Sequence, residues 1–517
     1  MRQRFAGASA LGDRVNPVAV KEFRQAVQSR WVIAVLMLFL LINLAIIGGY
    51  LMLSVDAATS TTGGRKIFAV LLTFLMITCI AFVPAYTGLR LSLERNNADI
   101  DLLFITTITP GAIVRGKYVT AMALTLLIFS VCMPFMILTY LLRGIDLPTI
   151  FGILGLGFAL CALANAMGLF AGSVSGSWFI RGLVIVGVAL ALLYMTIGSL
   201  GLAQSVLIFG RGMFGLGAGW WAGMATGLLF GALGIGLLHV LAVALMSPKT
   251  SNRMFIPRLY ITATWLITGI VMLAWGYVVG REYLLSAWIV MSGVALSGLV
   301  VAALGERDGW SARVRRTIPR NLILRPLAFL FYTGSAGGIA WCILLFAATA
   351  LPVLAWDAAG SSAGGRDLLE TLGYTSLFFG YILCYCLTTA ALRPVLFRDV
   401  PTPHLSVIAL FLGAMMCMGP CLLAFFFEQS MWSDVPWYTL GSPMVLTTND
   451  SQALYSAGGL VAVWLAMAAV ASAGWAFGQW RRFLPYHAEQ PAYEAVENRM
   501  PDSQTEYQRE TVGQQSS

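Results

Sequence analysis

Residues 31–53 read WVIAVLMLFLLINLAIIGGYLML and contain no charged side chain. An α-helix rises about 1.5 Å per residue, so this stretch is long enough to cross the roughly 30 Å hydrocarbon core of a bilayer. Apolar stretches of similar length follow it along the chain, at residues 67–89, 118–142, 151–171, 179–200, 220–246, 259–278, 284–304, 334–354, 376–392, 405–427 and 454–480. We therefore predict about twelve transmembrane helices.

The overall composition points to the same class of protein. Hydrophobic residues make up 59% of the 517 positions, charged residues make up 11%, and the mean hydropathy is +0.81. Soluble domains contain about 25% charged residues, so this chain could not cover a water-facing surface. Since helices satisfy their own backbone hydrogen bonds within a bilayer, we expect an all-α, polytopic helical membrane protein.

The basic residues predict the orientation of the helices. If the N-terminus is cytoplasmic, most of the 32 Lys and Arg residues fall in cytoplasmic segments. The exceptions would be Arg65, Lys66, Arg143, Arg211, Arg281 and Arg366. This bias follows the positive-inside rule and places both termini in the cytoplasm. The net charge of +9 then reflects topology, and we expect no nucleic-acid partner.

The order of these stretches predicts four regions. Residues 1–30 form a cytoplasmic or interfacial N-terminal region, residues 31–246 contain six spans, and residues 247–480 contain six more. Residues 481–517 are polar, and we expect them to form a disordered cytoplasmic tail.

An amphipathic helix is predicted before the first span. In residues 16–30, Val20, Phe23 and Val27 fall on one helical face, while Lys21 and Arg24 fall on the other. Asn16 suits the cap of this helix and Pro17 its first turn. We expect the helix to lie in the membrane interface in contact with lipids, with Lys21, Glu22, Phe23 and Arg24 as its candidate residues. The alternative is a lead-in segment that only orients the first span.

The segment between the second and third spans is also patterned. Residues 94–101 are rich in charge, residues 102–105 are apolar, and Thr109-Pro110 restarts a helix as cap and first residue. Asn96 or Asn97 can cap a short helix, and an acid in its first turn suits the helix dipole. We therefore expect a short helix followed by a sharp stop, although an ordinary loop would fit the same residues.

These two segments resemble those of ABC-2 type permeases, the membrane subunits of one class of ABC transporter. Members often begin with N-P-V-x-x-K-E-x-R-x-x-x-x-S-R, which is matched by Asn16, Pro17, Val18, Lys21, Glu22, Arg24, Ser29 and Arg30. Many carry E-R-x-x-G-T-L-E-L-L-L-x-T-P-L-S-x-x-x-I-V-x-G-K after the second span. Residues 94–117 here read ERNNADIDLLFITTITPGAIVRGK, so Ala98-Asp99 replaces Gly-Thr and Thr107 replaces the Pro. The resemblance covers about residues 16–246.

The resemblance implies a permease subunit of an export transporter in the bacterial cytoplasmic (inner) membrane. It implies an ATPase-coupling segment whose candidate residues are Glu94, Arg95, Asp99, Asp101, Leu102, Leu103 and Thr106. The chain contains no G-x-x-x-x-G-K-[ST] motif, so we expect no enzymatic activity of its own and no cofactor in this chain. ATP would be bound by a separate ABC ATPase subunit, and two permeases would form a homo- or heterodimer.

Other functions remain open at this point. A secondary transporter would usually carry ionisable residues at mid-membrane, and the predicted spans are almost free of them. A membrane scaffold, or an enzyme of unrecognised chemistry, is the other alternative, although the acids of the outer segments lack catalytic spacing. The run Met415-Met416-Cys417-Met418 with Cys421, together with Cys384 and Cys386, could suggest a Cu(I) site, but Met and Cys are also ordinary apolar residues of membrane spans.

Overall fold

The computed structural model describes residues 17–53, 63–96, 109–142, 145–174, 178–209, 218–248, 250–279, 283–321, 323–358, 365–397, 400–426, 440–447 and 451–486. These residues form helices and short connections, and no β-strand occurs among them. Twelve of the helical segments in these ranges are long and apolar enough to cross a membrane. The prediction of an all-α, polytopic helical membrane protein is therefore confirmed.

The chain divides into two compact units. The first unit comprises residues 1–249, 253–296 and 345–376, and the second comprises residues 250–252, 297–344 and 377–517. Three helices, α11 (Tyr283–Leu304), α14 (Ser335–Ala348) and α16 (Gly365–Leu396), contribute residues to both units.

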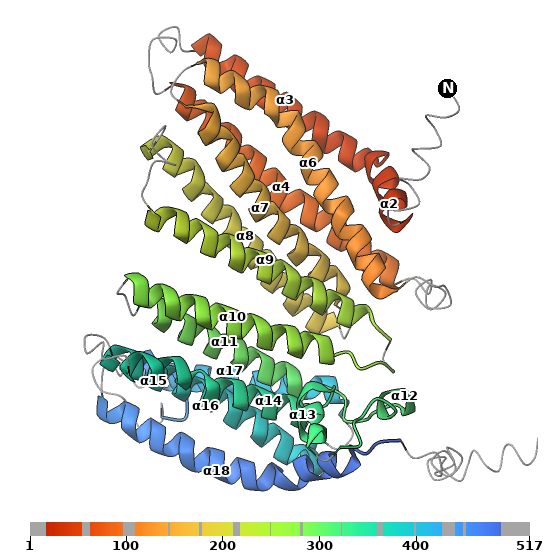
Figure 1. The fold of residues 1–517 in the computed structure, drawn as a ribbon, viewed down its shortest axis with the longest axis vertical. Helices are drawn as coiled ribbons and strands as arrows, with labels where there is room; N and C mark the ends of the chain where they lie inside the picture. Colours follow the sequence, from red (N-terminus) through yellow and green to blue (C-terminus); the bar gives the residue numbers. More distant parts are fainter. Residues whose placement is uncertain are drawn as a thin grey trace, which may run out of the picture. The chain divides into compact units, whose positions relative to one another are not determined.

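The first unit contains most of the long N-terminal helices. They are α2 (Pro17–Val27), α3 (Arg30–Leu53), α4 (Gly63–Asn96), α6 (Pro110–Leu141), α7 (Leu147–Ser173), α8 (Trp178–Phe209), α9 (Ala218–Met246), α10 (Phe255–Val279) and α15 (Ala350–Ala358). Helices α3, α4 and α6 to α9 run side by side (Figure 1). Helix α4 packs against α3, α6, α7 and α8, and its Phe68, Leu71 and Leu75 are fully buried. It is the central helix of this unit.

Glycines let α4 and α7 approach closely. A Cβ atom on Gly168 of α7 would lie 2.5 Å from the carbonyl oxygen of Pro84 and 2.7 Å from its Cα. A Cβ on Gly172 would likewise collide with the carbonyl oxygen of Gly88 on α4. Small residues spaced four apart are the usual means of close helix contact in a membrane. This contact fixes the C-terminal half of α4 on α7.

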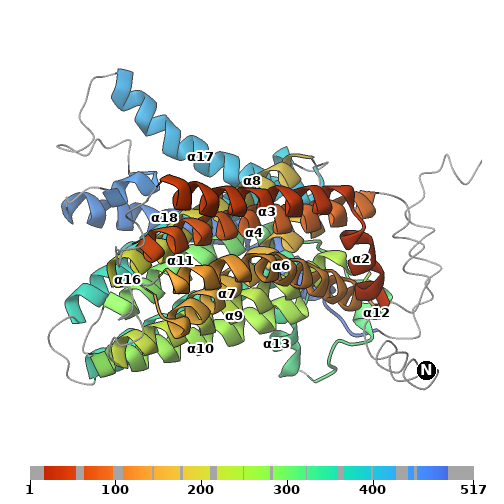
Figure 2. The same ribbon diagram turned by 90° about the horizontal axis from the view of Figure 1, so that it is seen from above.

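Helix α2 differs in direction from the long helices. It is turned across the end of α3 (Figure 2) and packs along α6. Pro17 is its first helical residue, as predicted, while Asn16 lies outside the described residues. The helix ends at Val27, and α3 begins at Arg30. The position of this helix in the membrane interface stays a prediction.

The ends of α4 and α6 frame the predicted coupling segment. Helix α4 continues to Asn96, beyond the predicted end of the span at residue 89, and Arg90 and Glu94 in this extension form ion pairs. Helix α6 starts as predicted, with Thr109 as cap and Pro110 in its first turn, and the Thr109 hydroxyl accepts a hydrogen bond from Ala112 N at 3.3 Å. Residues 97–108 lie outside the described residues, so the short helix expected there stays a prediction.

The second unit contains the remaining helices: α12 (Ala312–Arg315), α13 (Leu324–Phe331), α14 (Ser335–Ala348), α17 (Thr402–Phe426), the 3₁₀ helix η4 (Pro443–Thr447) and α18 (Ser451–Arg482). Helix α14 and the following α15 together make up one candidate span, Ser335–Trp356. Residues 481–486 are the described part of the predicted tail, and α18 ends within them at Arg482. The residues that follow are packed: Phe483 is fully buried, with Trp310, Phe329 and Tyr332 around its ring.

A polar network joins the start of α14 to the end of α18 within this unit. The Gln479 amide accepts a hydrogen bond from Ala336 N at 3.1 Å and donates one to Ser335 Oγ at 2.8 Å. Ser335 Oγ in turn donates to Asp308, which also pairs with Arg393. The Gln479 side chain thus satisfies a backbone N–H at a helix N-terminus that has no intrahelical partner.

We expect Gln479→Leu to lower the free energy of unfolding by about 1–3 kcal/mol, because the buried Ala336 N–H would lose its acceptor. Chemical denaturation of the purified protein in detergent would measure this change. Gln204→Leu is the matched control, since Gln204 is exposed on α8 and its replacement should change stability by less than about 0.5 kcal/mol. Equal effects of the two substitutions would contradict the assigned role of Gln479.

Candidate functional site

Four charged side chains from three helices meet at one end of the first unit. Glu22 comes from α2, Arg90 and Glu94 come from the last turns of α4, and Lys117 comes from the second turn of α6. We call these four residues the charge cluster. Two acids and two bases balance one another, as burial away from water requires.

Short contacts hold the charge cluster together. Lys117 Nζ lies 2.9 Å from Glu22 Oε1 and 2.6 Å from Glu94 Oε2. Arg90 Nε lies 3.6 Å from Glu22 Oε2 and 3.5 Å from Glu94 Oε1. The Arg90 guanidinium also donates hydrogen bonds to the Tyr86 hydroxyl, at 3.0 Å, and to the side chain of Gln25 on α2. Each acid therefore contacts both bases.

Burial makes the central pair of this cluster the most sensitive. Glu22 is 8% exposed and Lys117 is 4% exposed, whereas the side chain of Glu94 is 46% exposed. Removing one member of a buried pair leaves a charge without compensation, which is far more costly than removing a solvated one. Glu22 and Lys117 thus tie α2 to α6, and the more exposed Glu94 connects this pair to the C-terminal end of α4.

The faces of α2 explain why Glu22 points inward. Ala19, Glu22 and Ala26 are buried against the bundle, and Thr120 Oγ1 of α6 donates to the carbonyl oxygen of Ala19 at 3.4 Å. The small alanines let α2 lie close to α6, so the Glu22 carboxylate reaches Lys117. The predicted lipid-facing residues of α2, which include Val20 and Phe23, are exposed on the opposite side.

The other candidate residues of α2 lie away from the charge cluster. Lys21, Phe23 and Arg24 are exposed. Phe23 and Arg24 line a groove of about 480 Å³ that runs along α6 beside Val119 and Ala123. The structure therefore separates Glu22 from the three residues with which the sequence grouped it.

Of the predicted coupling residues, the structure places only the side chain of Glu94. Arg95 lies in α4, but its side chain is not among the described ones, and Asp99, Asp101, Leu102, Leu103 and Thr106 lie outside the described residues. Their role in coupling stays a prediction. Because α4 ends at Asn96 and α6 begins at Pro110, this segment is attached at both ends to helices that carry the charge cluster.

Sequence reasoning missed Arg90 and Lys117 as site residues. Both were treated as cytoplasmic charges that only orient the helices. Their signal was nevertheless present, because Arg90 is spaced four residues before Glu94 and Lys117 follows the start of α6 by only seven positions. A base near the end of an apolar helix is expected to have an acid nearby, and Glu22 and Glu94 were among the acids that the sequence offered.

The cysteines that the sequence offered as metal ligands are the remaining candidates for a site. Among the described residues, no group of three or more His, Cys, Asp or Glu side chains is arranged to hold a metal ion. Cys384 donates a weak hydrogen bond to the carbonyl oxygen of Val461, and Cys386 is buried on the same helix, α16. The side chain of Cys421 is not among the described ones, so the copper alternative stays a hypothesis.

Comparisons with known proteins add no relative. No model of a known protein family matches this chain, and no curated protein matches it. The resemblance to ABC-2 type permeases therefore stays a prediction that rests on the residues themselves.

Proposed function

We propose that this chain is the membrane-spanning permease subunit of an ABC-2 type export transporter, located in the bacterial cytoplasmic membrane. It would pair with a separate ABC ATPase subunit, which binds and hydrolyses ATP, and two permeases would form a homo- or heterodimer. The proposal rests on the two sequence segments that resemble this family and on the multi-pass helical architecture of the chain.

One observation supports it above the others. Glu22 belongs to the N-P-V-x-x-K-E segment, Glu94 begins the E-R segment, and Lys117 ends the G-K segment. Glu22 precedes Glu94 by 72 positions and Lys117 by 95 positions. All three residues nevertheless meet in the charge cluster. The motif positions that carry the resemblance are therefore also spatial neighbours, which a chance match of letters would not require.

The geometry suggests how force would pass through the subunit. An ATPase docked on the segment between α4 and α6 would push on the ends of both helices. Because Glu22 contacts Lys117 of α6 and Arg90 of α4, α2 would follow this motion. Movement of α4 would then reach α7, on which it packs through Gly168 and Gly172. Together these contacts would let the first unit respond to ATP binding as one body.

We expect the double variant Asp99→Ala, Asp101→Ala to lose co-purification with the ABC ATPase that binds the unaltered chain, because the acids would contact the ATPase surface. Pull-down from detergent-solubilised membranes measures the loss. These two residues are preferred to Glu94, whose removal would also disturb the charge cluster. The ATPase should carry P-loop and L-S-G-G-Q motifs.

Glu370→Ala provides the control for this experiment. Glu370 is exposed at the start of α16, on the side predicted to be external, so its removal should leave ATPase binding and membrane insertion unchanged. Full ATPase recovery with the double variant would contradict the coupling assignment. Absence of any ATPase partner for the unaltered chain would contradict the proposed function itself.

A further inference from the structure

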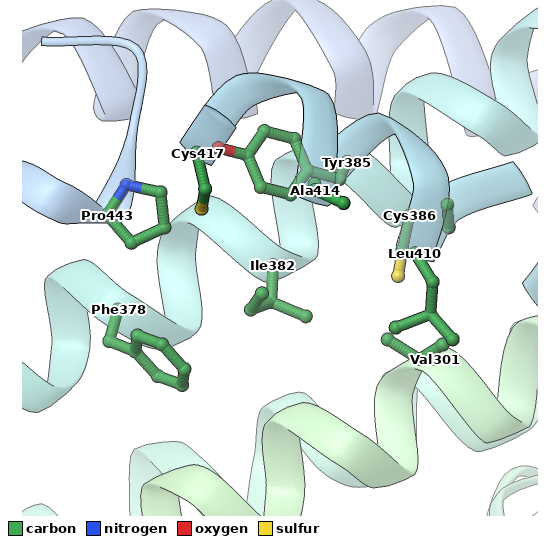
Figure 3. Close-up of a pocket in the computed structure, with 11 residues that line it drawn as sticks. Val301, Phe378, Ile382, Tyr385, Cys386, Leu410, Ala414, Cys417 and Pro443 are labelled. Atoms are coloured by element: carbon green, nitrogen blue, oxygen red, sulfur yellow. The ribbon is translucent and has the colours of Figure 1, made fainter. Parts of the chain in front are cut away.

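The second unit contains an apolar cavity between α16 and α17. It has a volume of about 240 Å³. Figure 3 shows the side chains around it: Ile382 and Cys386 come from α16, Leu410, Ala414 and Cys417 come from α17, and Pro443 comes from η4. Val301 of α11 closes another side. We call this space the α16–α17 cavity.

Two tyrosines hold Pro443 in the wall of the cavity. The hydroxyl of Tyr385 donates to the carbonyl oxygen of Gly441 at 3.0 Å, and that of Tyr381 donates to the carbonyl oxygen of Leu440. The two rings stack with centroids 6.4 Å apart. These bonds fasten the start of residues 440–447 to α16, so Pro443 reaches the cavity.

The bond from Tyr385 also satisfies the hydroxyl that would otherwise be the strongest polar group in the cavity wall. Tyr385 lines the space with its ring, while its hydroxyl is already bonded to Gly441. The other lining side chains are aliphatic, aromatic or thiol groups. A buried water needs two to four polar partners, and apolar cavities of roughly 150 Å³ stay dry and accept benzene-sized molecules. Water is therefore a poor occupant of this larger cavity, and an apolar molecule is a good one.

The depth of the cavity indicates which apolar molecule is available. Ala414 follows Leu405, the first residue of the predicted span, by nine positions, which corresponds to about 14 Å of helix. This distance is close to the middle of a hydrocarbon core of roughly 30 Å. At that depth the surrounding medium consists of lipid acyl chains.

The exposed side of α17 presents the cavity to that medium. Leu410 is 45% exposed at the rim of the cavity, and Phe411, Met415 and Met418 on the outer face are 57% or more exposed. All four side chains are apolar, so this face suits hydrocarbon and not an aqueous channel. The buried wall, with Ala409 and Cys386, lies behind the rim.

We propose that the α16–α17 cavity is a binding site for the acyl chain of a membrane lipid, which enters past Leu410 and packs against Ile382 and Cys386. An empty space would leave these walls without contacts on one side, and an acyl chain supplies them. The proposal does not depend on the proposed transport function, because it concerns a different unit and only the chemistry of its walls.

Photo-cross-linking in vesicles tests this site. The unaltered full-length chain is placed in vesicles of phosphatidylethanolamine and phosphatidylglycerol that contain a phosphatidylcholine with a diazirine near the methyl end of one acyl chain. Mass spectrometry then compares the label on the inner wall, at residues 382–386, with the label on the outer face at Phe411 and Met415. We expect labelling of both surfaces.

A filling variant and a matched control separate the cavity from the general lipid surface. Ala414→Leu places a larger side chain in the cavity wall and should lower the label on residues 382–386 by roughly tenfold, while Phe411 stays labelled. Gly419→Leu adds bulk on the same helix where no atom lies within 4 Å, and should change neither label. If Ala414→Leu does not fold, Cys417→Leu fills the space from another position.

Two results would overturn the proposal. The first is an inner wall that stays unlabelled while Phe411 and Met415 are labelled, as would occur if a second copy of the chain or another protein covered the opening. The second is unchanged inner-wall label in both folded filling variants.

Discussion

Lys117→Met is expected to lower the free energy of unfolding by about 3–5 kcal/mol, because it leaves the buried Glu22 carboxylate without its closest cation. Arg90 cannot fully replace Lys117, since Arg90 Nε lies 3.6 Å from the Glu22 carboxylate and also contacts Glu94 at 3.5 Å. Denaturation of the purified protein in detergent, followed by circular dichroism, would measure the loss.

Lys21→Met is the matched control for this substitution. Lys21 precedes Glu22 on α2 but is exposed, so removal of its charge should change stability by no more than about 0.5 kcal/mol. A second comparison uses Glu22→Leu together with Lys117→Met. Replacing both members of a buried pair with apolar residues is often nearly neutral, so the double variant should be more stable than Lys117→Met alone. Equal losses for Lys117→Met and Lys21→Met would show that the charge cluster is effectively solvated.

This expected rescue bears on what the charge cluster does. A buried ion pair adds little net stability compared with apolar residues of similar size. We infer that the cluster mainly fixes where α2 lies on the ends of α4 and α6. The double variant would then fold, but α2 would be held less specifically on α4 and α6, and under the proposed function the coupling of ATP hydrolysis to transport would weaken.

Much of the fold was predictable because it depends on local sequence. Apolar runs such as residues 31–53 are long enough to define spans by themselves, and Pro17 and the Thr109-Pro110 pair mark helix starts through the chemistry of the first turn. The predicted ends of the helices were less accurate than their starts. Helix α4 passes residue 89 because polar residues that have partners can extend a helix beyond its apolar run.

The charge cluster was not predictable in the same way, because its partners are distant in the chain. Glu22 and Lys117 are 95 positions apart, and no local periodicity relates them. The helical pattern of α2 identified Val20, Phe23 and Val27 as its apolar face, yet the buried face is the narrower one with Ala19, Glu22 and Ala26. Small residues carry little hydrophobic signal, although they allow the closest packing.

The α16–α17 cavity also could not be predicted from the sequence. Its walls come from residues that read simply as parts of apolar spans, and voids depend on how side chains from several helices meet. Tyr381 and Tyr385 gave a partial signal, since tyrosine hydroxyls inside a span need acceptors. The acceptors are backbone carbonyls of residues 440 and 441, which no sequence pattern identifies.

Gly168→Ala is expected to lower the free energy of unfolding by about 3 kcal/mol, at the upper end of the usual cost of overpacking. The added Cβ would lie 2.5 Å from the carbonyl oxygen of Pro84 and 2.7 Å from its Cα. These are backbone atoms with no alternative rotamer, so α4 and α7 would have to separate. Thermal unfolding in detergent, monitored by circular dichroism, would detect the loss.

Gly155→Ala on the same helix should have the opposite sign. No atom lies within 4 Å of its added Cβ, so only the better helix propensity of alanine remains, and stability should rise by up to about 1 kcal/mol. Helix α4 also carries Arg90 and Glu94, so its displacement by Gly168→Ala should disturb the charge cluster and make a further Lys117→Met substitution cost less than it does alone. Strict additivity of these two substitutions would mean that the α4–α7 contact and the charge cluster are independent.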